Sequence, residues 1–464
     1  MTSEEYNVKP KQAEALKDLN KIIGKKLPCL DERGIPAFGV KIDDDNVVSL
    51  WLERCGLTKL PEQILKLDTL KELYLGYNLL IALPESFDKL QLIVKLNLRW
   101  NFLNSLPKTF GNLTLLEELE LDTNKLTTLP ESFGNLRALQ GLILRNNQFE
   151  SLPESFSNLS SLKELYLSKN KFTQFPESVC NLKSLEGLYL DYNNLSTLPE
   201  TIGNLKTLQI LSLAGNSLKV LPEKILEPLF SLNSLRVLGF SHNQLKSLPE
   251  AIGNLTKLKV LRLRDNHLKD LPESFRKLES LQSLDISKNN FKEFLGPVLK
   301  LSNLERLYAE NNELKSLPES FGNLKSLKQL YLENNQIKTL PKSFGDLELL
   351  QQIFLVNNHL TTLPVSIGNL KSLRILDLRN NQLTSLPNSI GNLKSLEELD
   401  LRYNEFITIP SIIRKLENLR QFFLKLEGNP FNIKSARMIS KDVKSIREFL
   451  KRKENLSNLI DKSK

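Results

Sequence analysis

Hydrophobic residues recur along most of the chain with a fixed period of 23 residues. In the unit that starts at Leu327, apolar residues occupy positions 1, 4, 6, 11, 14, 18 and 21, with asparagine at position 9 and proline at position 15. Apolar side chains at positions 4 and 6, separated by one residue, predict a short β-strand. Because a fixed period between about 20 and 50 residues is typical of repeat architectures, the pattern predicts a solenoid of stacked units.

The repeat can be placed at seventeen successive starts, which fill approximately residues 47 to 431. These starts are Val47, Leu70, Ile93, Leu116, Leu139, Leu162, Leu185, Leu208, Leu235, Leu258, Leu281, Leu304, Leu327, Leu350, Leu373, Leu396 and about Leu419. The unit from Leu208 is 27 residues long, with four extra residues near Leu226 to Ser234. Since these residues follow the strand, we expect them to enlarge the convex side.

The alternation along each strand places positions 3, 5 and 7 on the face opposite the leucines. Strands about 4.8 Å apart would form a concave parallel sheet on the order of 80 Å long, which suits a folded protein better than a small-molecule substrate. The asparagines at position 9, from Asn78 to Asn404, are expected to pair with backbone groups at each turn. Asn311, at position 8, is expected to be exposed and structurally unimportant. Phenylalanines at position 18 are expected to form a buried spine: Phe87, Phe110, Phe133, Phe156, Phe275, Phe321 and Phe344.

Both ends of the array carry segments that could cover its core. In residues 1–46, apolar residues at helical spacing over 9–23 end at Gly24, and a strand from Phe38 leads through a turn into the first repeat. In residues 432–464, Ser440 could cap a basic helix. Its apolar face would be Val443, Ile446, Phe449 and Leu450. The sequence thus predicts an N-terminal cap (1–46), the array (47–431) and a C-terminal capping helix (432–464).

Amphipathic aromatic residues gather at repeat positions 5 and 8, on the predicted strand face and its rim. They form three clusters: Trp51, Tyr74, Tyr77 and Trp100; Tyr166, Tyr189 and Tyr192; and Tyr308, Tyr331 and Phe354. Such residues are common binding hot spots, although aromatic side chains also simply suit strands. Between the last two clusters, small residues such as Gly215 could let a partner approach the sheet closely. We treat the three clusters as candidate partner-binding residues.

The formal net charge of +9 raises the possibility of a nucleic-acid partner, so the location of the charge matters. Positions 2, 3, 5, 7 and 8 of the first sixteen units hold 17 basic and 18 acidic residues, which makes the predicted inner face nearly neutral. Residues 432 to 464 hold ten basic and four acidic residues. This end could contact RNA or an anionic membrane, or be the solvated side of the capping helix. On the inner face, an acidic block (Glu117, Glu118, Glu120, Asp122) and a basic block (Arg236, Lys259, Arg262, Arg264) favour a protein partner.

The sequence carries no signature of catalysis or of a cofactor. It has no glycine-rich phosphate loop, and its three histidines lie in different units. We therefore expect neither enzyme activity nor a cofactor or metal, and a monomeric protein. An odd count of three cysteines and the absence of a hydrophobic leader or of a long apolar segment favour a reducing, cytoplasmic location.

The motif from Leu317 to Leu324, Leu-Pro-Glu-Ser-Phe-Gly-Asn-Leu, and its many near copies resemble intracellular leucine-rich repeats of the 23-residue kind. The resemblance is to the Ras-group leucine-rich repeat scaffolds and their plant and prokaryotic relatives. It implies an α/β repeat fold, a horseshoe with a concave parallel sheet and short 3₁₀, turn or helical segments behind it. It also implies a scaffold that holds a small GTPase or a phosphatase subunit. An inhibitor that clamps an enzyme in the concavity, and a nucleic-acid or anionic-surface binder acting through the basic tail, stay open as alternatives.

Overall fold

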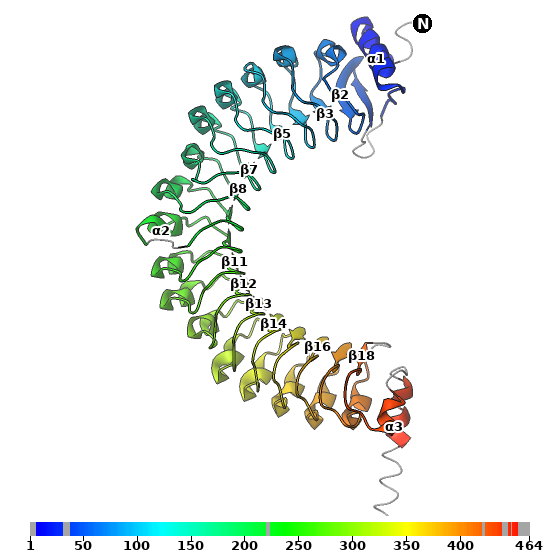
Figure 1. Cartoon of the computed structure of the whole chain (residues 1–464), viewed down its shortest axis with the longest axis vertical. Coiled ribbons are helices and arrows are strands. Elements are labelled where there is room, and N and C mark those ends of the chain that lie inside the picture. The colour runs from blue at the N-terminus through cyan, green and yellow to red at the C-terminus, as the bar shows by residue number, and fades with distance from the viewer. Residues whose placement is uncertain are drawn as a thin grey trace, which may run out of the picture. The chain divides into compact units, whose positions relative to one another are not determined.

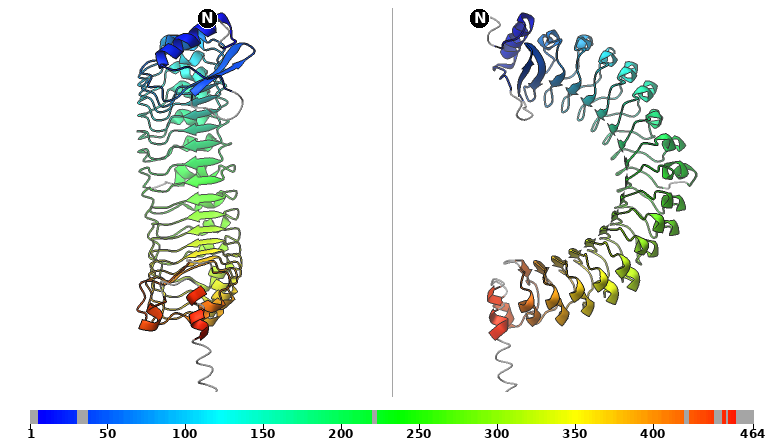
Figure 2. Two further views of the ribbon diagram at one scale, coloured as in Figure 1. Left: turned by 90° about the vertical axis from the view of Figure 1, so that its right-hand side faces the viewer. Right: turned by 180° about the vertical axis from the view of Figure 1, so that it is seen from behind.

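The structure is a computed structural model that describes residues 6–30, 38–219, 223–419, 423–438, 444–446 and 448–452. The chain divides into two compact units, Met1–Gly239 and Phe240–Lys464. Within each unit, the strands line the inner side of a curve and the 3₁₀ helices line the outer side (Figure 1). Figure 2 shows the strands of each unit as a regular ladder. The leucine-rich repeat solenoid expected from the sequence is therefore confirmed.

The first unit begins with helix α1 (Pro10–Ile23) and the hairpin β1 (Phe38–Asp43) and β2 (Asn46–Leu52). Its later strands are β3 (Glu72–Tyr74), β4 (Lys95–Asn97), β5 (Glu118–Glu120), β6 (Gly141–Ile143), β7 (Glu164–Tyr166), β8 (Gly187–Tyr189), β9 (Ile210–Ser212) and β10 (Val237–Gly239). The helices behind them are η2 (Glu62–Lys66), η3 (Glu85–Lys89), η4 (Phe110–Asn112), η5 (Glu131–Asn135), η6 (Glu154–Asn158), η7 (Glu177–Asn181), η8 (Glu200–Asn204) and α2 (Glu223–Phe230). β1 is antiparallel to β2, and β2 to β10 are parallel in chain order.

The second unit repeats the same arrangement. Its strands, parallel in chain order, are β11 (Val260–Arg262), β12 (Ser283–Asp285), β13 (Arg306–Tyr308), β14 (Gln329–Tyr331), β15 (Gln352–Phe354), β16 (Ile375–Asp377), β17 (Glu398–Asp400) and β18 (Leu424–Lys425). Its helices are η9 (Glu250–Asn254), η10 (Glu273–Lys277), η11 (Gly296–Lys300), η12 (Glu319–Asn323), η13 (Lys342–Asp346), η14 (Val365–Asn369), η15 (Asn388–Asn392), η16 (Ser411–Lys415) and α3 (Ile433–Ala436).

The strand register agrees with the predicted starts except in the last unit. Leu424 pairs with Leu399, 25 residues earlier, so the last strand lies two residues later than the 23-residue period predicts. Leu419 itself has the contacts of position 1, because it is buried and its N–H donates to the Leu416 carbonyl, as the Leu396 N–H donates to the Leu393 carbonyl. With this register Asn429 occupies position 9, and its Nδ2 donates to the Leu401 carbonyl at 2.8 Å.

Helix α1 forms as the sequence predicts and fits against the first repeats. Pro10 stands in the first turn, where the missing N–H costs nothing, and Gly24 ends the helix with φ of 76°. Buried Gln12 accepts a hydrogen bond from the Val47 N–H at 2.8 Å and donates to Thr69 Oγ1 at 2.7 Å. A polar side chain on α1 thus satisfies backbone at the open edge of the array.

The asparagines at position 9 form the expected ladder. Asn101 Nδ2 donates to the carbonyls of Leu75 and Leu98 at 3.0 and 3.1 Å, and its Oδ1 accepts from the Leu80 N–H at 3.0 Å. The same pattern recurs at Asn124 and at Asn404. Each asparagine therefore joins its own unit to the preceding one. The first repeat, which starts at Val47, has Cys55 at position 9.

The phenylalanines at position 18 are fully buried, as predicted. Phe87, Phe110, Phe133 and Phe156 stack in succession with ring centroids 6.1, 6.1 and 6.2 Å apart. In the second unit, Phe321 and Phe344 stack at 5.9 Å. In the 27-residue unit, the eight-residue helix α2 stands where most units have a five-residue 3₁₀ helix. The extra residues therefore lie on the outer side, as expected (Figure 1).

Position 8 has a backbone conformation that the sequence analysis did not anticipate. From Arg54 to Gly428, the residue at this position has φ between 50° and 76°, in the left-handed region; examples are Tyr77 (56°), Trp100 (52°) and Asn311 (56°). Asn and Gly adopt this conformation at little cost, whereas other residues are strained. The expectation that Asn311 has no structural role was wrong. Its Oδ1 also accepts a hydrogen bond from Asn334 Nδ2 at 3.1 Å.

The C-terminal segment is helical where it is described. Besides α3, residues 444–446 and 448–452 are α-helical. Ile446 and Leu450 are buried, Phe449 is half-buried, and Lys444, Lys451 and Arg452 are exposed. The predicted N-cap Ser440 and the predicted apolar Val443 lie outside the described residues.

Candidate protein-binding surface

Aromatic side chains at position 5 stack on one another between neighbouring strands. Position 5 is the last residue of each three-residue strand, and parallel pairing with a 23-residue offset brings equal positions together. In the first unit, the rings of Trp51 and Tyr74 are 5.4 Å apart and those of Tyr166 and Tyr189 are 4.3 Å apart. In the second unit, Tyr308, Tyr331 and Phe354 form a triple stack with spacings of 4.6 and 4.8 Å. Each predicted cluster therefore contains a preformed stack.

Guanidinium groups extend two of these aromatic clusters. Arg145 lies over the ring of Tyr166 at 4.3 Å and near that of Tyr189 at 5.9 Å. Arg54 and Arg99 lie 4.9 and 5.2 Å from the ring of Tyr77. Such contacts are attractive because the face of an aromatic ring is electronegative. The sequence analysis missed these arginines because they come from repeat positions 7 and 8 of adjacent units.

The aromatic residues at position 8 lie at the ends of the strands. Tyr77 stacks on Trp100 at 5.5 Å, and Trp100 is 50% exposed. Tyr192 is 53% exposed, and a Cβ on Gly215 would lie 2.5 Å from its ring. Tyr192 therefore lies beside Gly215, which is half-buried, and a larger residue at that position would collide with the tyrosine ring.

Trp51 is buried, although the sequence predicted that it would be exposed on the strand face. It is only 7% exposed, because β1 pairs beside its strand, with Gly39 opposite Trp51, and Tyr74 stacks on its ring. Its Nε1 is buried without a hydrogen-bond partner in the structure. Tyr74, Tyr166, Tyr189, Tyr308, Tyr331 and Phe354 are half-buried. The accessible part of the first cluster is therefore Tyr74, Tyr77 and Trp100.

The two predicted binding arginines of the second unit have different surroundings. Arg262 is exposed on β11. Arg264 Nη1 contacts Glu310 Oε1 at 2.7 Å and donates to Ser287 Oγ at 2.8 Å. The charge of Arg264 is therefore balanced within the unit, and Arg262 is the more accessible of the two.

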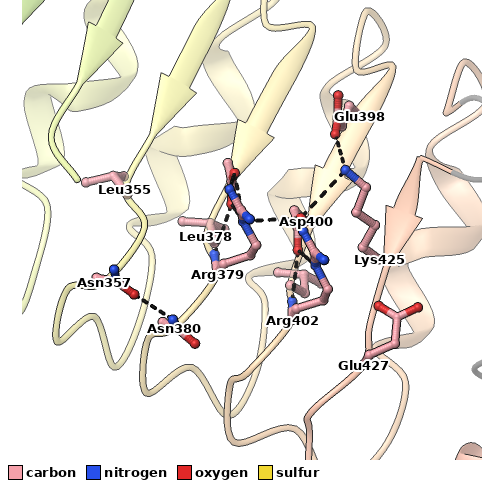
Figure 3. A network of polar contacts seen from close by, with 12 residues as sticks. Leu355, Asn357, Leu378, Arg379, Asn380, Glu398, Asp400, Arg402, Lys425 and Glu427 are labelled. Atoms are coloured by element: carbon pink, nitrogen blue, oxygen red, sulfur yellow. Dashed lines mark hydrogen bonds and ion pairs between the residues drawn. The ribbon is translucent and has the colours of Figure 1, made fainter. Parts of the chain in front are cut away.

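At the C-terminal end of the second unit, charged side chains on three strands form a network around Asp400 (Figure 3). The carboxylate of Asp400 is nearly inaccessible, and it pairs with Arg402 at 2.7 Å, Arg379 at 3.4 Å and Lys425 at 3.8 Å. Lys425 also contacts Glu398 at 2.7 Å. Because these charges neutralise one another, the network stiffens this end of the sheet and leaves no strong charge there.

Burial changes the ionisation of several groups on the strand face. Burial, together with the nearby Glu72, Glu118 and Glu120, raises the pKa of Tyr74 to about 12, so its phenol stays protonated at neutral pH. Burial also raises the pKa of Glu120 and of Asp122. In the second unit, burial and the neighbouring Glu310 raise the pKa of Glu333 to about 7.

Family comparisons agree with the repeat geometry. The family described as "Leucine-rich repeat region" matches residues 119–192, 224–336 and 327–460, and that described as "Leucine Rich Repeat" matches residues 184–205. The chain belongs to the leucine-rich repeat family. No curated protein matches the sequence.

Solved leucine-rich repeat structures are similar over most of the chain. A leucine-rich repeat protein of Leptospira interrogans is 36% identical, with 84% of this chain and 92% of that chain covered and a TM-score of 0.72. The ectodomain of the Arabidopsis thaliana membrane receptor kinase GASSHO1/SCHENGEN3, solved in complex with CASPARIAN STRIP INTEGRITY FACTOR 2, is 29% identical, with 85% and 57% covered and a TM-score of 0.55. Drosophila Toll, solved in complex with Spatzle, is 25% identical, with 81% and 52% covered and a TM-score of 0.67.

Other features of the leucine-rich repeat chain bear on its chemistry. Among the described residues, no group of three or more His, Cys, Asp or Glu side chains could hold a metal ion. None of the helices in the described part of the chain is both long and apolar enough to span a membrane. Cys29, Cys55 and Cys180 are free thiols.

Proposed function

We propose that this leucine-rich repeat protein is a non-enzymatic scaffold that binds a partner protein through the aromatic residues on its strand faces. The observation that carries the proposal is the triple stack of Tyr308, Tyr331 and Phe354. Stacked rings hold each other in place, so a partner that packs against them orders few further side chains. Two similar structures were solved as complexes, GASSHO1/SCHENGEN3 with CASPARIAN STRIP INTEGRITY FACTOR 2 and Toll with Spatzle, which supports a binding role.

Two stacks supply the anchors of the proposed surface. The first is Tyr166 and Tyr189, with Arg145 over Tyr166 and the exposed Tyr192 nearby. The second is the triple stack of the second unit. Because each combines rigid aromatic area with polar groups, each has the composition of a binding hot spot. Small GTPases and phosphatase subunits are the partner classes to test first, on the resemblance to Ras-group scaffolds.

A reducing, cytoplasmic location is part of the proposal. Its support is the three free thiols, one of which, Cys180, is buried. Burial raises the pKa of the Cys180 thiol to about 11, so this side chain is an unreactive part of the core. Fractionation of cells that express the chain checks the location.

The test is an affinity capture with purified small GTPases and phosphatase subunits and with lysate, using two triple variants. One replaces Tyr166, Tyr189 and Tyr192 with Ala, and the other replaces Tyr308, Tyr331 and Phe354 with Ala. Each anchor in a desolvated hot spot should cost about 1 to 4 kcal/mol of binding. A control that replaces the exposed Thr173 and Ser196 with Ala, in the same repeats as Tyr166, Tyr189 and Tyr192, should bind as the wild type does.

Thermal melts of the same proteins separate binding from folding. Since the aromatic side chains lie outside the leucine core, both triple variants should still fold cooperatively, and each lost stack should cost only about 0.5 to 1.5 kcal/mol of stability. Variants that fold normally and retain every partner would contradict the proposal. Variants that lose partners only because they unfold would return these residues to a structural role.

A further inference from the structure

One flank of the first unit carries an apolar surface that other repeats lack. Position 10 follows the asparagine ladder, on the segment that leaves the strand. It is Leu79 and Phe102 in the units that start at Leu70 and Ile93, whereas every unit from Leu116 to Leu396 has a polar or charged residue there. Position 12 is Ile81 in the Leu70 unit. The repeat therefore does not require apolar residues at these positions.

These residues are adjacent in space and exposed. The Leu79 N–H donates to the Leu57 carbonyl and the Phe102 N–H to the Leu80 carbonyl, both at 2.8 Å, so consecutive segments run side by side. Leu79, Ile81 and Phe102 are 46%, 56% and 42% exposed. Exposed Trp100, stacked on Tyr77, continues the surface toward the strand ends. We refer to Tyr77, Leu79, Ile81, Trp100 and Phe102 as the flank patch.

Cations surround the flank patch. Arg54 lies 4.9 Å from the ring of Tyr77, and Lys125 lies 4.9 Å from the ring of Phe102. Lys59 is exposed in the preceding unit. In the first four repeats, positions 8, 10, 12 and 13 hold three basic residues (Arg54, Lys59, Lys125) and no acidic residue. The flank thus combines an apolar centre with a positive rim.

The backbone at position 8 does not favour the two aromatic residues Tyr77 and Trp100. Tyr77 and Trp100 have φ of 56° and 52°. Asparagine, which tolerates this conformation better, occupies position 8 in four consecutive repeats of the second compact unit, from Asn311 to Asn380. Strain accepted at an exposed site is a common mark of a functional surface.

We infer that the flank patch binds an acidic segment of a partner protein that presents apolar side chains. Charge complementarity selects this partner. A second copy of the chain would bring two positive rims together, which is unfavourable. An anionic membrane is typically held by clusters of about four to eight basic residues, more than the rim offers. The inference is independent of the proposed function because no position-5 aromatic belongs to the patch.

The test selects peptides from a displayed random library on the full chain, with counter-selection on the variant Leu79→Gln, Ile81→Thr, Phe102→Gln. These replacements follow residues that the chain itself uses at the same positions, such as Gln148 and Thr127. The matched control is Ile407→Thr, an exposed isoleucine at position 12 of another unit. Recovered peptides should combine Asp or Glu with apolar residues, and should bind the triple variant about tenfold or more weakly than the control.

Two further measurements keep the inference open to refutation if the triple variant melts early. The double variant Lys59→Glu, Lys125→Glu reverses the charge of two exposed residues of the rim and should weaken peptide binding by a similar factor. Added salt should weaken peptide binding to the wild type. In Trp51→Phe, where Trp100 is the only tryptophan, the peptide should shift fluorescence emission to shorter wavelength.

Several outcomes would overturn the inference. They are recovery of no patch-dependent peptide, recovered peptides without an acidic bias, binding that the rim reversal does not change, and preferential binding of phosphatidylserine vesicles. Loss of peptide binding with retained capture by the position-5 stacks would separate this site from the proposed function.

Discussion

The ends of the strands differ between the two compact units although their backbone is the same. In the first unit, the consecutive position-8 residues Tyr77 and Trp100 stack at 5.5 Å, with Arg54 and Arg99 beside the tyrosine. In the second unit, four consecutive repeats have asparagine at position 8, and these asparagines form a ladder. Asn334 donates to Asn311 at 3.1 Å, Asn357 to Asn334 at 2.6 Å, and Asn380 to Asn357 at 2.6 Å, the last visible in Figure 3.

The difference separates what the repeat requires from what it permits. Every repeat requires a residue with left-handed backbone at position 8. Asparagine adopts this conformation easily and also forms side-chain hydrogen bonds between repeats. Tyr77 and Trp100 supply the same turn at greater conformational cost and expose aromatic area. Surface function in this chain is therefore best sought where a unit departs from the residue that its backbone favours.

The largest expected effect concerns the two asparagines of one unit. Asn312 Nδ2 donates to the carbonyls of Ile286 and Ala309, and its Oδ1 accepts from the Phe291 N–H at 3.2 Å. Asn312→Ala should lower the free energy of unfolding by about 1 to 3 kcal/mol for each buried group left unpaired. Asn311→Ala should cost about 1 kcal/mol, because alanine is strained at positive φ. Denaturant unfolding of both variants checks this, and equal losses would contradict the distinction between positions 8 and 9.

The second effect tests the carboxylates beside the asparagine ladder. The pKa of Glu333 is raised from 4.5 to about 7, chiefly by burial, so between these values the folded chain holds a proton that the unfolded chain has released. Its contribution to stability is complete below about pH 4.5 and is lost as the pH rises through 7. After allowance for solvent screening, the loss is about 1 to 2 kcal/mol.

Glu333→Gln should remove this part of the pH dependence, and Glu348→Gln, at an exposed site, should not. Denaturant unfolding at several pH values between 4 and 8 gives the difference. An unchanged slope in Glu333→Gln would mean that Glu333 ionises normally in the folded chain.

The smallest effect separates strain from stacking at Trp100. Trp100→Ala loses the stack on Tyr77 and keeps an unfavourable backbone, so it should destabilise the chain by about 0.5 to 1.5 kcal/mol. Trp100→Asn loses the same stack but relieves strain, and should stay within about 0.5 kcal/mol of the wild type. If the two variants unfold alike, the left-handed conformation at this position carries no measurable strain.

Most of the fold could be predicted because every repeat carries the same apolar core positions. The strands, the asparagine ladder, the phenylalanine spine and helix α1 each follow from local spacing of residue types. The left-handed turn at position 8 could also have been predicted, since asparagine and glycine recur there, but the aromatic exceptions drew attention away from it.

The candidate surface was only partly predictable because its properties depend on neighbours from other units. Trp51 is buried by a hairpin strand that the repeat pattern does not include. The pKa of Glu333 depends on Glu310 and Asp377, which come from other units. The final strand moved by two residues because its spacing from the preceding strand is 25 residues. Pattern analysis within one unit cannot supply such information.

The asparagine ladder also gives the array a direction. Asn78 accepts hydrogen bonds from the N–H groups of Cys55 and Leu57 and donates to the Leu52 carbonyl, so it completes the unit before its own. The first repeat, which starts at Val47, has no preceding repeat to complete. This explains why it can have Cys55 where the other repeats have the ladder asparagine. During synthesis from the N-terminus, each repeat is therefore finished only when the next one has emerged. A nascent chain stopped at any repeat boundary carries one incomplete unit, and always at its growing end.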